Sequence, residues 1–390
     1  MKKLLAFILA IGMIFSLAAC GGDKTGTDGE VKQESKELDY ANISEDDLIK
    51  KYIKDPQNVT AEEFINLVST FSYAKINEDD LILEENVTDK AIQKLRNDKA
   101  TLPKPNEFVE TLLKSESPQV RGYAYSQSQS LLGVNSGILP TIKEALKTEK
   151  EPYVLRHAAL VLANEASKDP EIASFLLDTL KNENAALRKS VIVYLCNSKN
   201  KNLDGLVDAL IELMNDPDEN VRKNAYEYSG NLGDERIIAP ITEMLKKPEE
   251  IDFHIKGIKG LVELWYNYPF YENTSEAAYR ATLDYLNTHV GSEIPVRDAV
   301  ASFSSKSDDY DEWRKKAPYF NTDEVYGVMV NIIKDENLDW SIRTNAFNTI
   351  ESHCTKEQFI ALGEIVNGLT GKDAALIQKE YKRRMEDVEE

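Results

Sequence analysis

Residues 220–245 read NVRKNAYEYSGNLGDERIIAPITEML, and this stretch contains the pattern that decides the fold. The pair Val221-Arg222 is followed three positions later by a small residue, Ala225. Gly233-Asp234 then interrupts the helical pattern, and a second apolar helical segment occupies 238–245. Glycine often ends a helix because it adopts positive φ without steric cost. The stretch therefore predicts a helix, a short turn and a second helix.

The same pattern recurs along the chain at an almost constant interval. The equivalent arginines are Arg121, Arg156, Arg188 and Arg222, which are separated by 35, 32 and 34 residues. A small or β-branched residue stands three positions after each arginine, and a second apolar helical segment precedes each copy. Weaker copies follow at Lys256, Arg297 and Arg343. Self-similarity at this period is typical of solenoids, so we predict an all-α stack of helical hairpins.

These residues resemble the HEAT-repeat family, in particular the short HEAT-like repeats of the phycobilisome-lyase type. The resemblance rests on 220–222, Ala225, 232–234 and 238–245, and its convincing copies extend over 106–250. It implies an α-solenoid in which the valine and alanine pack between helices and the arginine bonds to the turn of a neighbouring repeat. It also implies that the four repeated arginines are structural ladder residues rather than catalytic groups, because side chains recurring at the repeat period serve the repeat.

The N-terminal residues have the composition of a secretory signal, with Lys2 and Lys3 before an apolar run at 4–16. Leu17-Ala18-Ala19-Cys20 followed by glycine resembles the lipobox of bacterial lipoproteins. The resemblance implies cleavage before Cys20 and lipidation of its sulfur, for example by palmitate. We therefore expect a signal peptide at 1–19 and a protein anchored by lipid to the extracytoplasmic face of the cell membrane. The alternative is an ordinary signal peptide with a chance cysteine.

The rest of the chain divides by composition and by the strength of the repeat. Few large apolar side chains occur after Cys20, so we expect the lipidated cysteine and a flexible tether at 20–42. An N-terminal helical cap region is expected at 43–105, with helices at 44–54, 60–75 and 88–98. The later segments expected are HEAT-like repeats at 106–250, degenerate repeats at 251–378 and a charged tail at 379–390.

Aromatic residues gather in an insertion at 265–320 that breaks the repeat period. They lie mainly at 265–271 and 310–313. Such a cluster is either a local plug of core or a recognition patch. We favour the core interpretation, because buried aromatic side chains dominate packing energetics.

The net charge, the cysteines and the acidic run each limit the partners or sites that the chain can have. A formal net charge of −20 disfavours nucleic acid and anionic lipid surfaces as direct partners, since both attract clustered positive charge. Cys196 and Cys354 are expected to form one bridge or none, and we favour two buried free thiols over a bridge. The acidic run at 308–312 lacks the mid-loop glycine of a calcium loop.

The histidines give no metal site by spacing. They are His157, His254, His289 and His353, and none has a second histidine or a carboxylate at zinc-binding spacing. The His-Glu pair by which HEAT-fold hydroxylases hold iron is also absent from the sequence. We therefore expect no enzyme activity, no catalytic residue, no metal and no cofactor.

The second helix of each hairpin is expected to build a long concave surface. The side chains expected to line it for a protein or peptide partner at the cell envelope are Tyr123, Gln127, His157, Asn164, Lys189, Lys223, Tyr226 and Glu227. Tyrosine and amide side chains supply contact area and hydrogen bonds. The alternative for these residues is that several only fill the ridge between helices.

Two classes of function remain open from the sequence. One is a membrane-anchored, non-catalytic interaction scaffold, which needs no catalytic residues. The other is an envelope solute-binding protein or enzyme that uses the aromatic and acidic insertion at 265–320. The partner's identity and the oligomeric state do not follow from the sequence.

Overall fold

The computed structural model describes residues 75–83, 105–134, 137–267, 272–288, 296–297, 299–300, 303 and 310–389. The chain divides into two units, residues 1–44 and 45–390, and all of the described residues belong to the second. The predicted signal peptide, Cys20, the tether and the helices expected at 44–54 and 88–98 lie outside the described residues. The helix expected at 60–75 lies outside them too, apart from its last residue.

Residues 105–265 form helical hairpins, and each hairpin has a shorter first helix (helix A) and a longer second helix (helix B). The pairs are α5 (Pro105–Leu113) with α6 (Pro118–Gly133), α7 (Leu139–Leu146) with α8 (Pro152–Leu162), α9 (Pro170–Thr179) with α10 (Ala185–Leu195), α11 (Leu206–Leu213) with α12 (Glu219–Tyr228), and α13 (Ile238–Leu245) with α14 (Ile251–Trp265). Short 3₁₀ helices continue or join them: η4 (Ala163–Glu165), η5 (Ser198–Asn200), η6 (Ser229–Leu232), η7 (Glu235–Ile237) and η8 (Pro248–Glu250).

The second half of the unit is also helical. It contains α15 (Glu276–Thr288), α17 (Tyr310–Lys316), α18 (Thr322–Lys334) with α19 (Trp340–His353), and α20 (Lys356–Asn367) with α21 (Ala374–Glu389). None of the described helices combines the length and the apolar character that crossing a bilayer requires.

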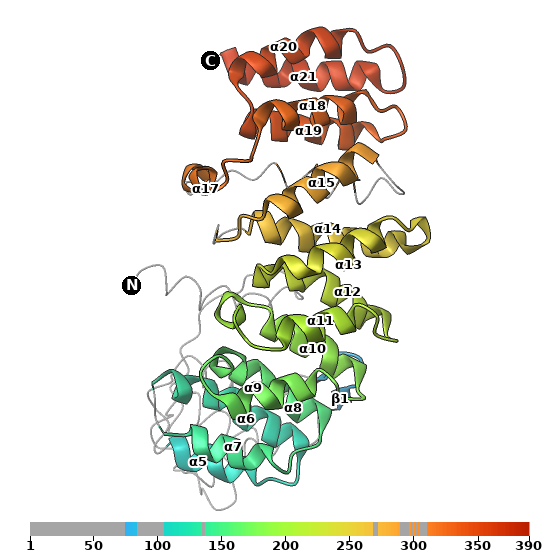
Figure 1. Ribbon diagram of the computed structural model, residues 1–390. Helices are drawn as coiled ribbons and strands as arrows, with labels where there is room; N and C mark the ends of the chain where they lie inside the picture. Colours follow the sequence, from blue (N-terminus) through green and yellow to red (C-terminus); the bar gives the residue numbers. More distant parts are fainter. Residues whose placement is uncertain are drawn as a thin grey trace, which may run out of the picture. The chain divides into compact units, whose positions relative to one another are not determined.

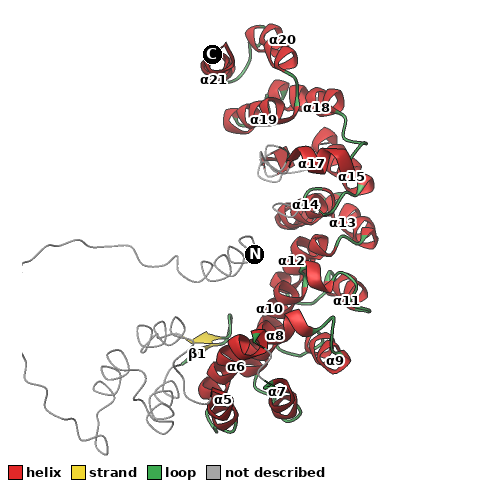
Figure 2. Cartoon of the chain, turned by 90° about the vertical axis from the view of Figure 1, so that its left-hand side faces the viewer, coloured by secondary structure: helices red, strands yellow, loops and turns green. Residues whose placement is uncertain are grey.

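The hairpins stack in chain order, as Figure 1 shows for α5 to α21. Each B helix packs on the next one, from α6 through α8, α10 and α12 to α14. Figure 2 shows the two resulting layers, with α7, α9, α11 and α13 on one side and α8, α10, α12 and α14 on the other. The prediction of an all-α solenoid of helical hairpins is therefore confirmed.

Local sequence explains where the B helices begin and which face they bury. Asn184 and Asp218 cap α10 and α12 through their side-chain oxygens, which accept from free backbone N–H groups of the first turn. The valine and alanine of the opening stretch, Val221 and Ala225, are both 0% exposed. Gly233 ends η6 with φ of +72°, a conformation that favours glycine.

The described aromatic residues of the insertion are core. Trp265 and Trp313 are 1% and 0% exposed, and their ring centroids lie 5.8 Å apart. The indole Nε1 of Trp313 donates to the carbonyl oxygen of Trp265 at 2.9 Å. The core interpretation therefore holds for these residues, whereas 268–271, 304–309 and the side chain of Tyr310 lie outside the described part.

The C-terminal segment differs from the predicted charged tail. The boundary expected between residues 378 and 379 falls inside α21, and Tyr381 is only 6% exposed. The Tyr381 hydroxyl donates to the carbonyl of Phe359 at 3.0 Å, and Arg384 pairs with Glu351 at 2.9 Å. The dense charge of this segment concealed a narrow apolar stripe at helical spacing, Ile377 and Tyr381.

A small β-hairpin occurs in the region expected to form a helical cap. Strand β1 (Ile76–Asn77) pairs antiparallel with β2 (Ile82–Leu83), in the register Ile76 to Leu83. It falls between the helices expected at 60–75 and 88–98. Strands of two residues are too short to produce the alternation by which strands are recognised in a sequence.

Candidate interaction surface on the B helices

Six polar side chains and one valine from three successive B helices form one row on the B-helix layer. We define this row as the B-helix strip, and its members are Lys189, Val193, Lys223, Glu227, Lys256, Lys259 and Glu263. Within each helix they stand three or four positions apart and so share one face. Glu227 of α12 contacts both Lys256 and Lys259 of α14, which joins the two helices across the strip.

The strip concentrates positive charge in an otherwise acidic chain. Its lysine side chains are 25–46% exposed, whereas the whole chain carries a net charge of −20. Lys256 and Lys259 share Glu227, the second of them at 3.3 Å. Lys223 pairs with Glu219 on its own helix and lies 5.6 Å from the ring centre of Phe253. The lysines therefore exceed the carboxylates of the strip.

Two of the predicted contact residues are not on this surface. Tyr123 and Tyr226 are only 6% and 8% exposed, which favours the alternative that they fill the ridge between helices. The ring of Tyr226 meets Phe253 of the next B helix edge to face, with centroids 6.1 Å apart. The side chain of Tyr226 reaches the neighbouring helix because successive B helices pack directly on one another.

The other predicted contact residues divide between the strip and its margin. Lys189, Lys223 and Glu227 belong to the strip. Gln127 and Asn164 are half-buried outside it. His157 is also half-buried, and its Nδ1 donates to the carbonyl of Tyr153 at 2.8 Å while the two rings lie tilted against each other with centroids 4.4 Å apart. A polar group committed in this way is less free to meet a partner.

The sequence prediction missed Lys256, Lys259 and Glu263. A signal was present, because Lys189, Lys223 and Lys256 follow one another at 34 and 33 residues, which is the repeat period. Lys256 had been recognised only as a weak copy of the ladder position. A periodic lysine therefore indicates the strip better than the tyrosines do.

The ladder arginines hold the turns together. Arg188 donates from Nε and NH2 to both oxygens of Asp216, at 2.9 and 2.7 Å, which lies in the next hairpin's turn. Its NH1 donates to the carbonyls of Asn182 and Glu183 in its own turn, at 2.7 and 3.0 Å. Arg121 makes the same arrangement with Glu149, 28 residues along the chain.

The other two ladder arginines meet a ring of the next hairpin instead of a carboxylate. Arg222 donates to two carbonyls of its own turn and lies 4.9 Å from the ring centre of Phe253. Arg156 is 7% exposed and lies 5.8 Å from the ring centre of Tyr194. The bond to a neighbouring turn that the resemblance implies is thus present at Arg121 and Arg188, and it is replaced by cation–π contact at Arg156 and Arg222.

The ladder pair Arg121 and Glu149 is ionised at neutral pH. Burial by itself would raise the pKa of Glu149, but the hydrogen bonds from Arg121 and from backbone N–H groups outweigh burial and lower it. The side-chain bond to Glu149 in turn raises the pKa of Arg121. These charges are structural, because each is directed at its partner rather than at solvent.

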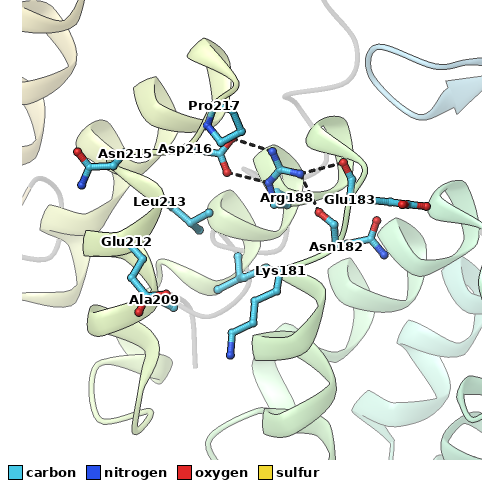
Figure 3. Close-up of a pocket in the computed structure, with 11 residues that line it drawn as sticks. Lys181, Asn182, Glu183, Arg188, Ala209, Glu212, Leu213, Asn215, Asp216 and Pro217 are labelled. Atoms are coloured by element: carbon cyan, nitrogen blue, oxygen red, sulfur yellow. Dashed lines mark hydrogen bonds and ion pairs between the residues drawn. The ribbon is translucent and has the colours of Figure 1, made fainter.

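A pocket of about 500 Å³ lies beside the Arg188–Asp216 pair, between the turns of two hairpins. Its lining residues are Leu180, Lys181, Asn182, Glu183, Arg188, Ala209, Glu212, Leu213, Asn215, Asp216 and Pro217. Figure 3 shows the guanidinium of Arg188 facing Asp216 and the two turn carbonyls, with Lys181 extending away from it. The described lining has no histidine, cysteine, serine or threonine.

The described residues contain no group of three or more histidine, cysteine and acidic side chains that could hold a metal ion. Cys196 and Cys354 are free thiols. Burial raises the pKa of both, that of Cys354 to about 12, so both are protonated and weakly nucleophilic at neutral pH. His289 and the acidic residues Asp308 and Asp309 lie outside the described part.

The ionisation of Glu263 in the strip is strongly perturbed by burial. Burial raises its pKa from 4.5 to about 7. Between these values the folded chain binds more protons than the unfolded chain, so the free energy of unfolding falls as pH rises through this window. This loss of stability is complete above pH 7 and absent below pH 4.5.

Glu263→Gln should remove this dependence, because the amide keeps the shape and carries no charge. We expect the variant to exceed the wild type in stability by about 1–3 kcal/mol at pH 8 and to match it near pH 4.5. Thermal melting at both pH values measures the difference. Glu243→Gln, at a side chain that is 67% exposed, is the control and should change neither value. An unchanged pH dependence in Glu263→Gln would contradict the assignment.

Residues 173–253 match the family of HEAT repeats. The matched part begins within α9 and ends at the start of α14, so it contains α10, α11, α12 and α13, and with them two helices of the strip. No curated protein matches the chain.

Proposed function

We propose that this protein is a non-catalytic scaffold of the bacterial cell envelope that binds a protein or peptide partner on the B-helix strip. HEAT repeats commonly present extended surfaces to other proteins, which supports an interaction role. The lipobox-like residues at 17–20 support an anchor at Cys20 on the extracytoplasmic face of the membrane. The observation that carries the proposal is the periodic row of lysines in a chain of net charge −20.

The strip favours an acidic partner segment. Three of its lysines, at 223, 256 and 259, face two carboxylates, Glu219 and Glu227. The lysine side chains are partly exposed, so a partner's carboxylate can reach them without complete desolvation of either group. Complementary charge of this kind chiefly raises the association rate and selects the partner.

The second candidate function, a solute-binding protein or enzyme built on the 265–320 insertion, has less support. Trp265, Tyr266 and Trp313 are at most 4% exposed and pack on one another. Rings that fill each other's space leave none for a solute, so no observation in the described part favours this candidate.

Crosslinking on intact cells tests the proposal. The C-terminally tagged protein is crosslinked through lysine, extracted in detergent, purified and analysed by mass spectrometry. We expect reproducible links from one envelope protein to Lys223 and Lys259. In co-purification without crosslinker, which does not depend on the lysine amines, we expect at least a fivefold loss of that protein in the double variant Lys223→Glu with Lys259→Glu. Partition of the wild type and Cys20→Ala between detergent and water tests the anchor in the same cells.

The matched control is Lys181→Glu with Lys246→Glu, which makes the same charge change at exposed residues after two A helices. This variant should keep the co-purified partner. Equal recovery of the partner with the strip variant and the control would overturn the strip as the binding surface.

A further inference from the structure

The β-hairpin of residues 76–83 sits on the B-helix strip. Lys189 donates from Nζ to Asp80 Oδ1 at 2.9 Å and to the carbonyl of Asp79 at 3.1 Å, across 109 and 110 residues of sequence. Both views place β1 beside α8 and α10 (Figures 1 and 2). The tip of the hairpin therefore contacts the strip at Lys189. We call this contact the seat of the hairpin.

The turn at the tip of the hairpin is held in a defined conformation. Asn77 Oδ1 accepts from the backbone N–H groups of Asp79 and Asp80, at 2.9 and 3.2 Å, which fixes the turn. Leu81 closes it with φ of +53°, in the left-handed region that leucine disfavours. Its side chain is nevertheless only 3% exposed. A strained backbone persists where surrounding contacts hold it, and here the burial of Leu81 does so.

The described attachment is small. Each strand has two residues, and an isolated two-stranded hairpin is marginally stable in water. The ion pair is partly open, with Lys189 and Asp80 side chains 26% and 58% exposed. Neighbouring apolar side chains stay open as well, Ile82 at 38% and Val193 at 36%. A contact of this size forms and breaks readily.

We propose that the hairpin is an intramolecular occupant of the Lys189 end of the strip, in the place of a partner segment of the same chemistry. That segment carries a carboxylate followed by a large aliphatic side chain, as Asp80-Leu81 does, and it binds by displacing the hairpin. The displacement rests on the proposed function, whereas the contact of the hairpin with Lys189 does not depend on it.

Acylation of lysines in the purified, detergent-solubilised full chain tests the seat. The chain is treated briefly with N-hydroxysuccinimidyl acetate, and modification of each lysine is followed by mass spectrometry. We expect Asp80→Lys to raise the acylation rate of Lys189 at least fivefold. Lys223 and Lys259 should react at unchanged rates, which also reports that the hairpins of the solenoid remain folded.

Glu78→Lys is the matched control, because it makes the same charge change at an exposed residue of the same tip. It should leave Lys189 protected. In hydrogen exchange, residues 76–83 should exchange more slowly in the wild type than in Asp80→Lys, and more slowly again when Lys189→Glu is added to Asp80→Lys. Equal acylation of Lys189 in wild type and Asp80→Lys would overturn the seat.

Crosslinking on intact cells tests the displacement. Asp80→Lys should at least double the partner links made from Lys223 and Lys259, because the strip is then open along its length. Unchanged links would overturn the displacement and leave the scaffold function standing. Absence of partner links in every variant would overturn the proposed function and with it the displacement, while the acylation rates decide the seat separately.

Discussion

Replacing Gly260 by alanine is expected to lower the free energy of unfolding by about 2–4 kcal/mol. A Cβ atom at Gly260 would lie 2.2 Å from the backbone oxygen of Tyr226, and one at Gly230 would lie 2.1 Å from the backbone oxygen of Gly260. Backbone atoms cannot rotate away as the end of a side chain can. The fourth and fifth hairpins must therefore move apart to accept the methyl group.

Gly327 provides the control for this substitution. It lies inside α18, and nothing would be within 4 Å of its Cβ. Gly327→Ala should therefore be neutral or stabilise the protein by up to about 1 kcal/mol, because alanine loses less backbone entropy in a helix. Both variants are compared by urea denaturation, and hydrogen exchange over residues 219–265 shows whether the loss is local, as expected for a solenoid. A Gly260→Ala variant as stable as Gly327→Ala would contradict the close packing of these hairpins.

Replacing Arg188 by methionine is expected to cost about 3–5 kcal/mol. Asp216 is 8% exposed, and the substitution leaves its charge buried without the guanidinium. The carbonyls of Asn182 and Glu183 lose a donor as well. Adding Asp216→Asn should recover part of the loss, because it removes the uncompensated charge and keeps an acceptor for the backbone N–H of Asp218.

Arg236→Met is the matched control. Arg236 pairs with Asp208 and Asp234, but its side chain is 56% exposed, and a pair this open contributes at most about 1 kcal/mol. Chemical denaturation of the three variants and the wild type gives the comparison. Equal losses at Arg188 and Arg236, or no recovery in the double variant, would show that the ladder does not stabilise the stack.

The repeat pattern predicted the stack well because it is a property of the core. Val221 and Ala225 recur at the repeat period and are fully buried, so their spacing reports packing directly. The surface is less predictable. Tyr123 and Tyr226 were expected to face a partner, but which side of a B helix is open depends on how successive helices pack, and the repeat does not specify this.

The β-hairpin could not be predicted for a different reason. Its strands are two residues long, and its position depends on a contact between Asp80 and Lys189, which lie 109 residues apart in the sequence. Neither periodicity nor local turn chemistry contains that information. The Arg121 and Arg188 bonds were anticipated through the family resemblance, whereas the rings that meet Arg156 and Arg222 follow only from the packing of the next hairpin.

The most direct test of the strip is a photo-crosslinking amino acid placed at one position on each layer of helices in intact cells. Lys259 represents the strip, and Asp178 on α9 represents the A-helix layer; both are exposed. We predict that the photo-crosslinker at 259 yields one partner adduct and that the one at 178 yields none. Adducts from 178 with none from 259 would place the partner on the opposite layer and contradict the account.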